Sequence, residues 1–336
     1  MRDATIGDKL DHYELTELLA RSGMASVFRA LDTLSGQTVV LKVPHFQFES
    51  DVVFHERFKR EENIGSRLEH PYVVRVLTPK YKTRVYLVME LAEGKSLRAI
   101  MDSQRRCTPT FAIDIARQIC EALVYMHGKG VIHRDLKPEN VLVNENGKIK
   151  ILDFGIALDE AARRLTWTGF SATVGTPTYM APEQINGRRG DVRTDIYALG
   201  MMLFEMVTGE LPFNDSNMNT LMRAKTTEAP LAPSHFMPDI DPSLEEIILH
   251  AIERSPKDRY PSAEQMLADL NDPASVKPRD RSQIRASAGF WERIPQPIRT
   301  GAIVLAVISA LCLLIFSSSK KSPRPPTSQT VDTRVR

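Results

Sequence analysis

The chain has 336 residues, 42% apolar and 26% charged, and this ordinary globular composition excludes disordered, collagen-like and coiled-coil chains. Its 44 Lys and Arg residues nearly balance 42 Asp and Glu residues, so the net charge of +2 gives no overall field for nucleic acid, and no nucleic-acid partner is expected. The three cysteines, Cys107, Cys120 and Cys312, are too few and too widely spaced for a disulfide framework and indicate a reducing compartment.

The first ten residues carry charges from Arg2 onward and contain no apolar run of signal-peptide length, so this end is expected to stay in the cytoplasm. Short runs rich in β-branched residues then predict strands at 38–43, 72–77 and 85–89. After Ser96 the pattern turns helical, with apolar residues recurring at intervals of three and four up to Met126. A small β-rich part therefore precedes a larger helical part.

The C-terminal part of the chain changes composition twice. Residues 271–299 mix prolines with Arg, Ser and Lys, which is typical of a linker. Residues 300–319 then form an uncharged stretch of 20 residues, and at about 1.5 Å per residue such a helix spans roughly the 30 Å of a bilayer's hydrocarbon core. We expect a transmembrane helix there and a short tail at 320–336. The alternative, a C-terminal helix buried in the soluble domain, is disfavoured because cations flank both ends of the stretch.

Two motifs in the helical part carry the strongest chemical signal. Residues 133–140 read His-Arg-Asp-Leu-Lys-Pro-Glu-Asn, and thirteen residues after that Asn comes Asp-Phe-Gly at 153–155. Together they resemble the catalytic and metal-binding loops of the protein-kinase family. The resemblance implies an α+β, two-lobed kinase fold over about 13–270. Its β-rich N-lobe would span about 13–92 and its helical C-lobe about 93–270.

The resemblance also implies a role for each polar residue of these loops. Asp135 would accept the proton of the substrate hydroxyl, and Lys137 would lie against the transferring phosphoryl group. Asn140 and Asp153 would hold Mg²⁺, a hard cation that prefers oxygen ligands. A lysine two residues after the aspartate is similar to the serine/threonine-directed members, which favours Ser and Thr over Tyr as acceptors.

The strand containing Val39 to Lys42 looks like the one whose lysine contacts the α- and β-phosphates of ATP. The resemblance implies that Glu61 is the helix partner of Lys42, because it lies nine residues before His70-Pro71, the interval expected by analogy with the family, and Glu62 is the competing choice. The residues expected to bind ATP form a loop, an apolar sandwich for adenine and a hinge: Leu19, Ala20, Arg21, Ser22, Gly23, Met24, Ala25, Ser26, Val27, Val40, Lys42, Met89, Glu90, Ala92 and Leu142.

The phosphate-covering loop departs from the family pattern. The family expects G-x-G-x-x-G, whereas Ala20, Ser22 and Ala25 stand at the three glycine positions. A β-carbon restricts both close approach to phosphate oxygens and positive φ. We therefore expect weaker nucleotide binding or slower turnover than in a glycine-replete relative. A pseudokinase, or a nucleotide-binding scaffold, is the alternative that this loop raises.

Residues 175–183, Gly-Thr-Pro-Thr-Tyr-Met-Ala-Pro-Glu, resemble the end of an activation segment that starts at Asp153. The segment suits an extended peptide substrate, which disfavours a small-molecule kinase of the same fold. Four hydroxyls are candidate sites of autophosphorylation: Thr166, Thr168, Ser171 and Thr173. Arg134 could pair with a phosphate there through charge-assisted hydrogen bonds.

Four further residues are expected to be structural. The resemblance implies that Thr176 contacts Asp135 and Lys137 and that Asp195 caps the catalytic-loop backbone. It also implies that Arg259 is the buried ion-pair partner of Glu183.

The sequence thus predicts a membrane-anchored serine/threonine protein kinase, similar to the eukaryotic-like kinases of bacteria. Its cofactors would be ATP and Mg²⁺, and its partners would be protein substrates, the chain itself through autophosphorylation, and a membrane through 300–319. Because ATP is cytoplasmic, the kinase domain is expected on the cytoplasmic side and residues 320–336 on the other.

Overall fold

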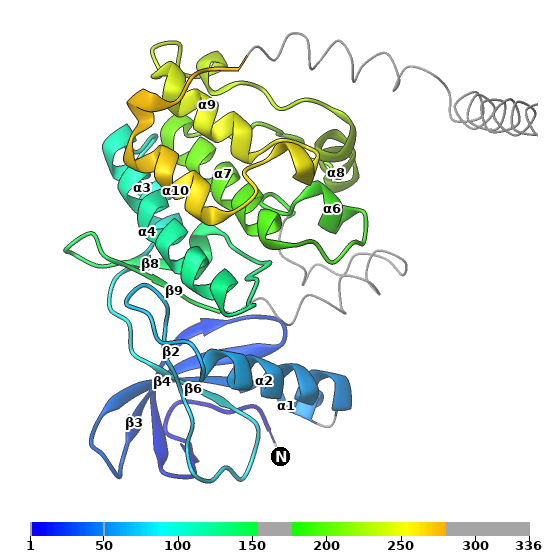
Figure 1. The fold of residues 1–336 in the computed structure, drawn as a ribbon. Helices are drawn as coiled ribbons and strands as arrows, with labels where there is room; N and C mark the ends of the chain where they lie inside the picture. The colour runs from blue at the N-terminus through cyan, green and yellow to red at the C-terminus, as the bar shows by residue number, and fades with distance from the viewer. Residues whose placement is uncertain (1, 50, 154–176, 280–336) are drawn as a thin grey trace, which may run out of the picture. The chain divides into compact units, whose positions relative to one another are not determined.

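The computed structural model describes residues 2–49, 51–153 and 177–279, and these form a smaller lobe rich in strands and a larger helical lobe (Figure 1). The two-lobed α+β prediction is confirmed. The predicted membrane helix and the tail lie outside the described residues. Among the residues that are described, no helix has both the length and the apolar character needed to cross a bilayer.

The smaller lobe is built on an antiparallel sheet. Its strands are ordered β1-β2-β3-β4-β6-β5, with bounds Lys9–Leu10, Tyr13–Arg21, Ala25–Asp32, Thr38–Pro44, Leu87–Glu90 and Val76–Leu77. Side chains alternate along β3: Phe28 and Ala30 are buried, whereas Arg29 and Leu31 face solvent. This sheet pairs Val27 with Lys42, so the lysine is placed across from the loop-bearing strand.

Two helices, α1 (Phe46–Glu49) and α2 (Val52–Gly65), follow β4 in the same lobe. The strand predicted at 72–77 is reduced to Val76–Leu77. The earlier part of that run pairs elsewhere: Val74 donates its N–H to Ile151 O at 2.9 Å, and Ile151 donates to Tyr72 O at 2.8 Å. The prediction was wrong there because alternating β-branched residues do not reveal which strand they will meet.

The larger lobe contains the helices and a small sheet. The sheet runs β7-β8-β9, with bounds Lys95–Ser96, Val141–Val143 and Ile149–Ile151. The α-helices are α3 (Leu97–Ser103), α4 (Pro109–Gly128), α6 (Pro182–Ile185), α7 (Val192–Thr208), α8 (Met218–Thr227), α9 (Pro242–Ala251) and α10 (Ala263–Asn271).

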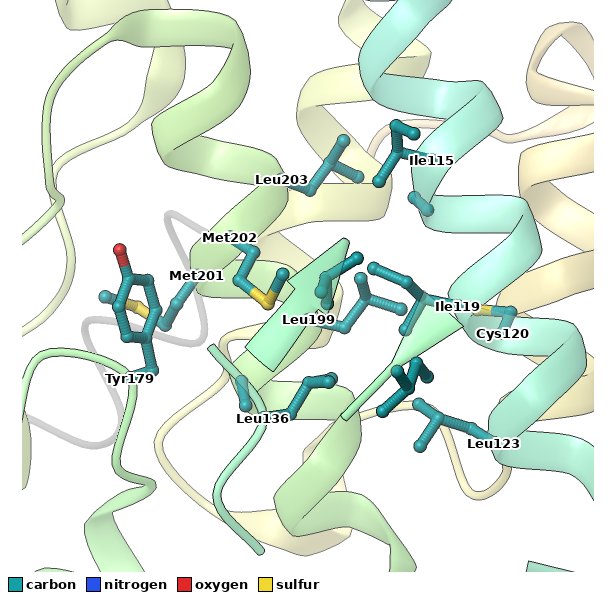
Figure 2. Packing of buried hydrophobic residues seen from close by; sticks show 14 of the residues in the cluster. Ile115, Ile119, Cys120, Leu123, Leu136, Tyr179, Leu199, Met201, Met202 and Leu203 are labelled. Carbon is teal, nitrogen blue, oxygen red and sulfur yellow. The ribbon is translucent and has the colours of Figure 1, made fainter. Parts of the chain in front are cut away.

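The core of this lobe lies where α4 meets α7 (Figure 2). Ile115, Ile119 and Leu123 are buried at intervals of four on α4, as the sequence periodicity predicts, and they pack in one cluster with Leu199 and Leu203 of α7. Leu136, within 133–140, packs in the same cluster, so this core also supports that loop.

One contact within this core leaves no room for a side chain. A β-carbon placed on Gly200 of α7 would lie 2.6 Å from Ala251 Cβ and 2.7 Å from Ile252 Cγ2. Glycine thus permits the close approach of α7 to the end of α9, the helix that Ala251 closes.

Candidate active site

Lys42 of β4 forms ion pairs with two carboxylates from different parts of the chain. Its Nζ lies 3.0 Å from Glu61 Oε1, on α2, and 2.6 Å from Asp153 Oδ1, two residues beyond β9. Glu62, the competing partner, turns to Lys82 instead, with 2.5 Å between Oε1 and Nζ. The structure therefore pairs Lys42 with the glutamate preferred from the sequence spacing.

The three charges shift one another's proton affinity. Burial disfavours the ionised form of all three groups, but the two carboxylates outweigh it and raise the pKa of Lys42 above its ordinary value. Burial raises the pKa of Glu61 to about 7 although Lys42 opposes the shift. For Asp153 the Lys42 ammonium prevails over burial and lowers the pKa. At neutral pH, Lys42 is thus a fixed cation and Asp153 a fixed anion.

The catalytic loop is held from below by Asp195 of α7. Its carboxylate accepts the backbone N–H of His133 at 2.9 Å and of Arg134 at 2.7 Å, and it lies 2.8 Å from His127 Nε2. These contacts are the cap that the resemblance implies. They satisfy buried backbone donors at a strained position, because Arg134 has a φ of 63°, a left-handed backbone conformation that residues other than glycine rarely adopt.

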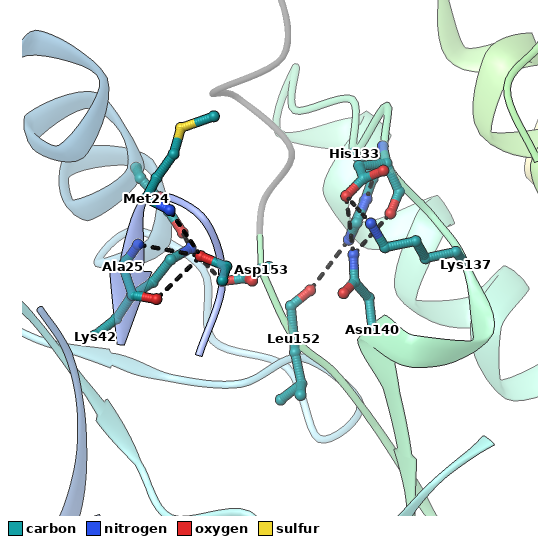
Figure 3. A network of polar contacts seen from close by, with 11 residues as sticks. Met24, Ala25, Lys42, His133, Lys137, Asn140, Leu152 and Asp153 are labelled. Atoms are coloured by element: carbon teal, nitrogen blue, oxygen red, sulfur yellow. Dashed lines mark hydrogen bonds and ion pairs between the residues drawn. The ribbon is translucent and has the colours of Figure 1, made fainter. Parts of the chain in front are cut away.

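Lys137 and Asn140, which Figure 3 shows side by side, both hydrogen-bond to Asp135. Lys137 Nζ lies 2.8 Å from Asp135 Oδ2, and Asn140 Nδ2 donates to the backbone oxygen of Asp135 at 2.8 Å. Because the amide uses its donor end on Asp135, its carbonyl oxygen is left as an acceptor. The backbone N–H of Leu152 donates to Asn140 O at 2.8 Å, which brings Asp153 close to Asn140.

The loop that connects β2 and β3 is closed by a side chain. The Ser22 hydroxyl donates to Ala25 O at 3.0 Å and accepts from Ala25 N at 3.1 Å and Met24 N at 3.3 Å. Within the described part of the chain, Asp11, Arg134 and Asp153 are the non-glycine residues with left-handed φ, so Ala20, Ser22 and Ala25 adopt ordinary backbone conformations. Steric strain of the backbone therefore does not weaken this loop, and only the expected crowding near phosphate remains.

The hinge after β6 has one backbone group already engaged. Glu90 donates its N–H to Arg75 O at 2.9 Å, and its side chain lies 2.5 Å from Lys150 Nζ. The backbone N–H of Glu90 is therefore not available for the contact with adenine that is expected at the hinge from the sequence. Leu19, which is expected from the sequence to contact adenine, is 41% exposed.

The ion pair expected between Glu183 and Arg259 is present and buried. Arg259 Nη1 and Nη2 lie 2.8 and 2.7 Å from the two carboxylate oxygens, and Thr194 donates to Glu183 at 2.9 Å. Burial opposes ionisation of Glu183, but the guanidinium outweighs it and lowers the pKa of the carboxyl. The pair fixes the end of the segment that begins near the catalytic loop.

Several further contacts of this segment were missed from the sequence. Gln184 accepts from Ala181 N and donates to Arg134 O, which joins the segment to the catalytic loop. Lys225 of α8 is 1% exposed and donates to Pro177 O at 3.0 Å. Lys225 was missed because a lysine is ordinarily expected in solvent, although its spacing of four residues from Leu221 places both on one face of α8.

Five predicted residues lie outside the described part of the chain: the candidate phosphosites Thr166, Thr168, Ser171 and Thr173, and the structural Thr176. The remaining site residues are all described.

Comparison with known proteins agrees with this geometry. Residues 13–270 match the protein kinase domain family. The chain is 38% identical over 271 residues to the probable serine/threonine-protein kinase PknB of Corynebacterium glutamicum, covering 77% of this chain and 42% of that protein. It is 36% identical over 265 residues to the serine/threonine-protein kinase PknB of Mycobacterium tuberculosis, with the same coverage.

The fold also matches a solved structure, the PknI kinase domain of Mycobacterium tuberculosis in a C20A mutant, with TM-score 0.63 and 25% identity over 81% of this chain and 99% of that one. The chain thus matches less than half the length of the curated relatives. It covers 99% of the solved PknI kinase domain. The pseudokinase alternative gains no support from these relatives, which carry kinase names. With 258 of its 336 residues inside the matched region, 13–270, the chain belongs to the protein kinase domain family.

Proposed function

We propose that the chain is a serine/threonine protein kinase that transfers the γ-phosphoryl group of ATP to hydroxyls of protein substrates and of itself. The observation that carries the proposal is the gathering of Lys42, Glu61 and Asp153 on one side and of Asp135, Lys137 and Asn140 on the other. Phosphoryl transfer needs mainly positioning and electrostatic stabilisation, and these groups supply both.

Each group has a task that suits its surroundings. The Asp135 carboxylate would accept the proton of the acceptor hydroxyl, and Lys137, 2.8 Å away, would neutralise charge on the transferring group. Lys42, fixed by Glu61, would hold the α- and β-phosphates of ATP.

The donor set also fits a magnesium ion. One ionised carboxylate, on Asp153, and one amide oxygen, on Asn140, are ligands that Mg²⁺ accepts alongside phosphate oxygens. Bound there, the ion would supply positive charge that neutralises the phosphates. The acceptors would be Ser or Thr, as Lys137 and the named relatives suggest.

The direct test is transfer of radiolabelled phosphate from Mg-ATP to a generic basic protein and to the chain itself. Asp135→Asn should lower transfer by about a hundredfold or more, since general-base catalysis contributes about 10²–10⁴-fold. Asp114→Asn, a matched change at a carboxylate 58% exposed on α4, should leave transfer unchanged. Equal transfer by both variants would sink the proposal.

Autophosphorylation is proposed for the hydroxyls between Thr166 and Thr173, with Arg134 as the pairing cation. Mass spectrometry after incubation with Mg-ATP should find phosphate in that stretch. Its absence from fully active protein would contradict this part.

We also propose that residues 300–319 anchor the chain in the cell membrane, with the kinase domain in the cytoplasm and residues 320–336 outside. The support is the uncharged 20-residue stretch between Arg299 and Lys320. Full-length chain should sediment with membranes after an alkaline carbonate wash, and a chain ending at residue 279 should not. Release of the full-length chain by that wash would exclude an integral anchor.

A further inference from the structure

Lys225 is a buried lysine, and no ion pair accounts for its burial. Its side chain is 1% exposed, and within the described ranges no carboxylate lies within 4.0 Å of it. Burying an ammonium costs several kcal/mol unless hydrogen bonds compensate, so an apolar residue would be the cheaper occupant. The partners of Lys225 should therefore show what it does.

Those partners are two consecutive backbone carbonyls of one segment. Lys225 Nζ donates to Pro177 O at 3.0 Å and also to Thr178 O. Pro177 O accepts a second hydrogen bond, from Met180 N at 3.2 Å, so the ammonium completes a turn in irregular backbone. Irregular backbone has no ladder of its own to satisfy its carbonyls, and a charged donor is a strong substitute.

The rest of the environment holds the amine in place, between an aromatic ring and a second basic side chain. Lys225 Nζ lies 5.2 Å from the centre of the Tyr197 ring on α7, whose ring also faces Arg259 at 4.7 Å. Burial lowers the pKa of Lys225 well below its ordinary value, and the Arg259 charge adds to this. An amine in either protonation state retains at least two N–H donors for the two carbonyls.

Lys225 is also a main attachment of its own helix. Leu221 and Lys225 are the two buried residues of α8, one turn apart, and the other side chains of the helix are at least partly exposed. The ammonium thus joins α8 directly to the start of the segment that runs on to Glu183.

That segment has independent anchors farther along. The Tyr179 hydroxyl bonds to Glu205 and accepts from Arg98 Nη1 at 3.2 Å, and Ala181 N donates to Gln184. None of these contacts reaches the carbonyls of Pro177 and Thr178. The described start of the segment therefore depends on Lys225 for its carbonyl contacts outside the turn.

We infer that Lys225 is a positioning residue for the protein substrate: it fixes the backbone at Pro177 and Thr178, which an extended peptide bearing the acceptor hydroxyl would meet. This inference rests on the proposed kinase function, since the segment is a substrate platform only in a kinase. It predicts that Lys225 governs recognition of the peptide and not of ATP.

Steady-state kinetics of the full chain test the prediction, with a basic protein as acceptor. Lys225→Met should raise KM for the acceptor by about tenfold, while KM for ATP and the rate of ATP hydrolysis without acceptor stay within about twofold. Lys225→Gln, which keeps a donor, should recover part of the loss. Lys129→Met is the matched control, because Lys129 is exposed and lies 5.9 Å from the centre of the Tyr125 ring.

Hydrogen–deuterium exchange tests the role of Lys225 in the segment separately from the proposed kinase activity. The backbone amides of 178–181 and of Glu183 should exchange at least several-fold faster in Lys225→Met, with those of 38–43 unchanged, whether or not the wild type transfers phosphate. A wild type without transfer would end the kinase proposal, and with it the substrate role, while exchange would still decide whether Lys225 fixes the backbone at Pro177 and Thr178. Unchanged exchange, or a KM for ATP that rises as much as that for the acceptor, would overturn the inference.

Discussion

Two neighbouring glutamates of α2, Glu61 and Glu62, have different partners in the structure. Spacing alone favoured Glu61 over Glu62, and nothing in their chemistry distinguishes them. In the structure each has a lysine of its own, because adjacent residues of a helix point about 100° apart. Glu61 points to the site and Glu62 points away from it, to Lys82.

These two residues therefore provide a matched pair of variants. Glu61→Gln should lower kcat by about ten- to a hundredfold, since Lys42 loses the charge that orients it and small misplacements are costly in catalysis. Glu62→Gln should leave kcat within about twofold. Phosphate transfer at saturating ATP measures both, and a larger loss in the second variant would refute the assignment of Glu61.

The Ser22 hydroxyl shows a residue-scale feature that no sequence pattern revealed. Three hydrogen bonds from one hydroxyl close the turn between β2 and β3, in a loop where glycines were expected. A change to glycine at this position would remove those bonds, so it would not simply improve the loop.

Ser22→Ala should raise KM for ATP by about two- to fivefold, because each hydrogen bond contributes about 0.5–1.5 kcal/mol and the loop is exposed. Ser35→Ala is the control: its hydroxyl bonds to Asp32 at 2.7 Å in the turn after β3. An ATP titration of phosphate transfer compares the two. Equal KM values for both variants would leave the Ser22 hydroxyl without a role in nucleotide binding.

At the scale of elements, helices were easier to predict than strands. The apolar spacing from Phe111 to Met126 specified α4, because one buried face with a period of 3.6 residues leaves little choice. The run at 72–77 was misassigned since strand pairing depends on distant residues. Helix contact distances were also invisible to the sequence, and the crossing of α7 and α9 at Gly200 is an example.

Two glycine substitutions test that crossing. Gly200→Ala should destabilise the protein by about 1–3 kcal/mol, since overpacking outweighs the gain in helix propensity. Gly128→Ala lies at the end of α4, where no atom from outside the adjacent helix backbone is within 4 Å of the added carbon, and it should leave stability unchanged or slightly raised. Thermal unfolding of both variants is the measurement, and a stable Gly200→Ala would mean that α9 yields easily.

For the molecule as a whole, the buried Glu183–Arg259 pair ties the end of the segment 177–183 to the helical lobe. Arg259 has further acceptors besides the carboxylate, the backbone oxygens of Glu253, Arg193 and Arg254. Removal of the carboxylate alone would leave a buried cation without its counter-charge.

Glu183→Gln should therefore lower the free energy of unfolding at pH 7 by about 3–5 kcal/mol, as measured with urea. The pKa of Glu183 is lower in the native state than its ordinary value of 4.5, so on acidification the unfolded chain takes up a proton at this carboxyl before the native protein does. The stability that the ionised Glu183 contributes is therefore lost as the pH falls from 4.5 through the native pKa. The gap between wild type and variant should narrow on acidification. A gap that stays constant with pH would contradict the assigned role, and Glu145→Gln, at an exposed turn, should show no gap.

Much of the chemistry of this molecule could be foreseen from short motifs, because contiguous residues such as those at 133–140 carry their geometry with them. Residues that act across the fold could not. Lys225, Gln184 and Ser22 have ordinary sequence surroundings, and their tasks arise only from what the chain brings next to them.

The pairing of Val74 with Ile151 affects how the two lobes can move. Since Val74 N and Ile151 O are joined at 2.9 Å, the stretch just beyond α2 travels with β9 rather than with the large sheet. An opening of the lobes that keeps this hydrogen bond would bend the chain between Val74 and Val76, where β5 begins, and near Glu90, where β6 ends. One end of α2, the helix that bears Glu61, is thereby linked to the larger lobe. A rotation of the sheet would change the angle between α2 and β4, and with it the distance between Glu61 and Lys42.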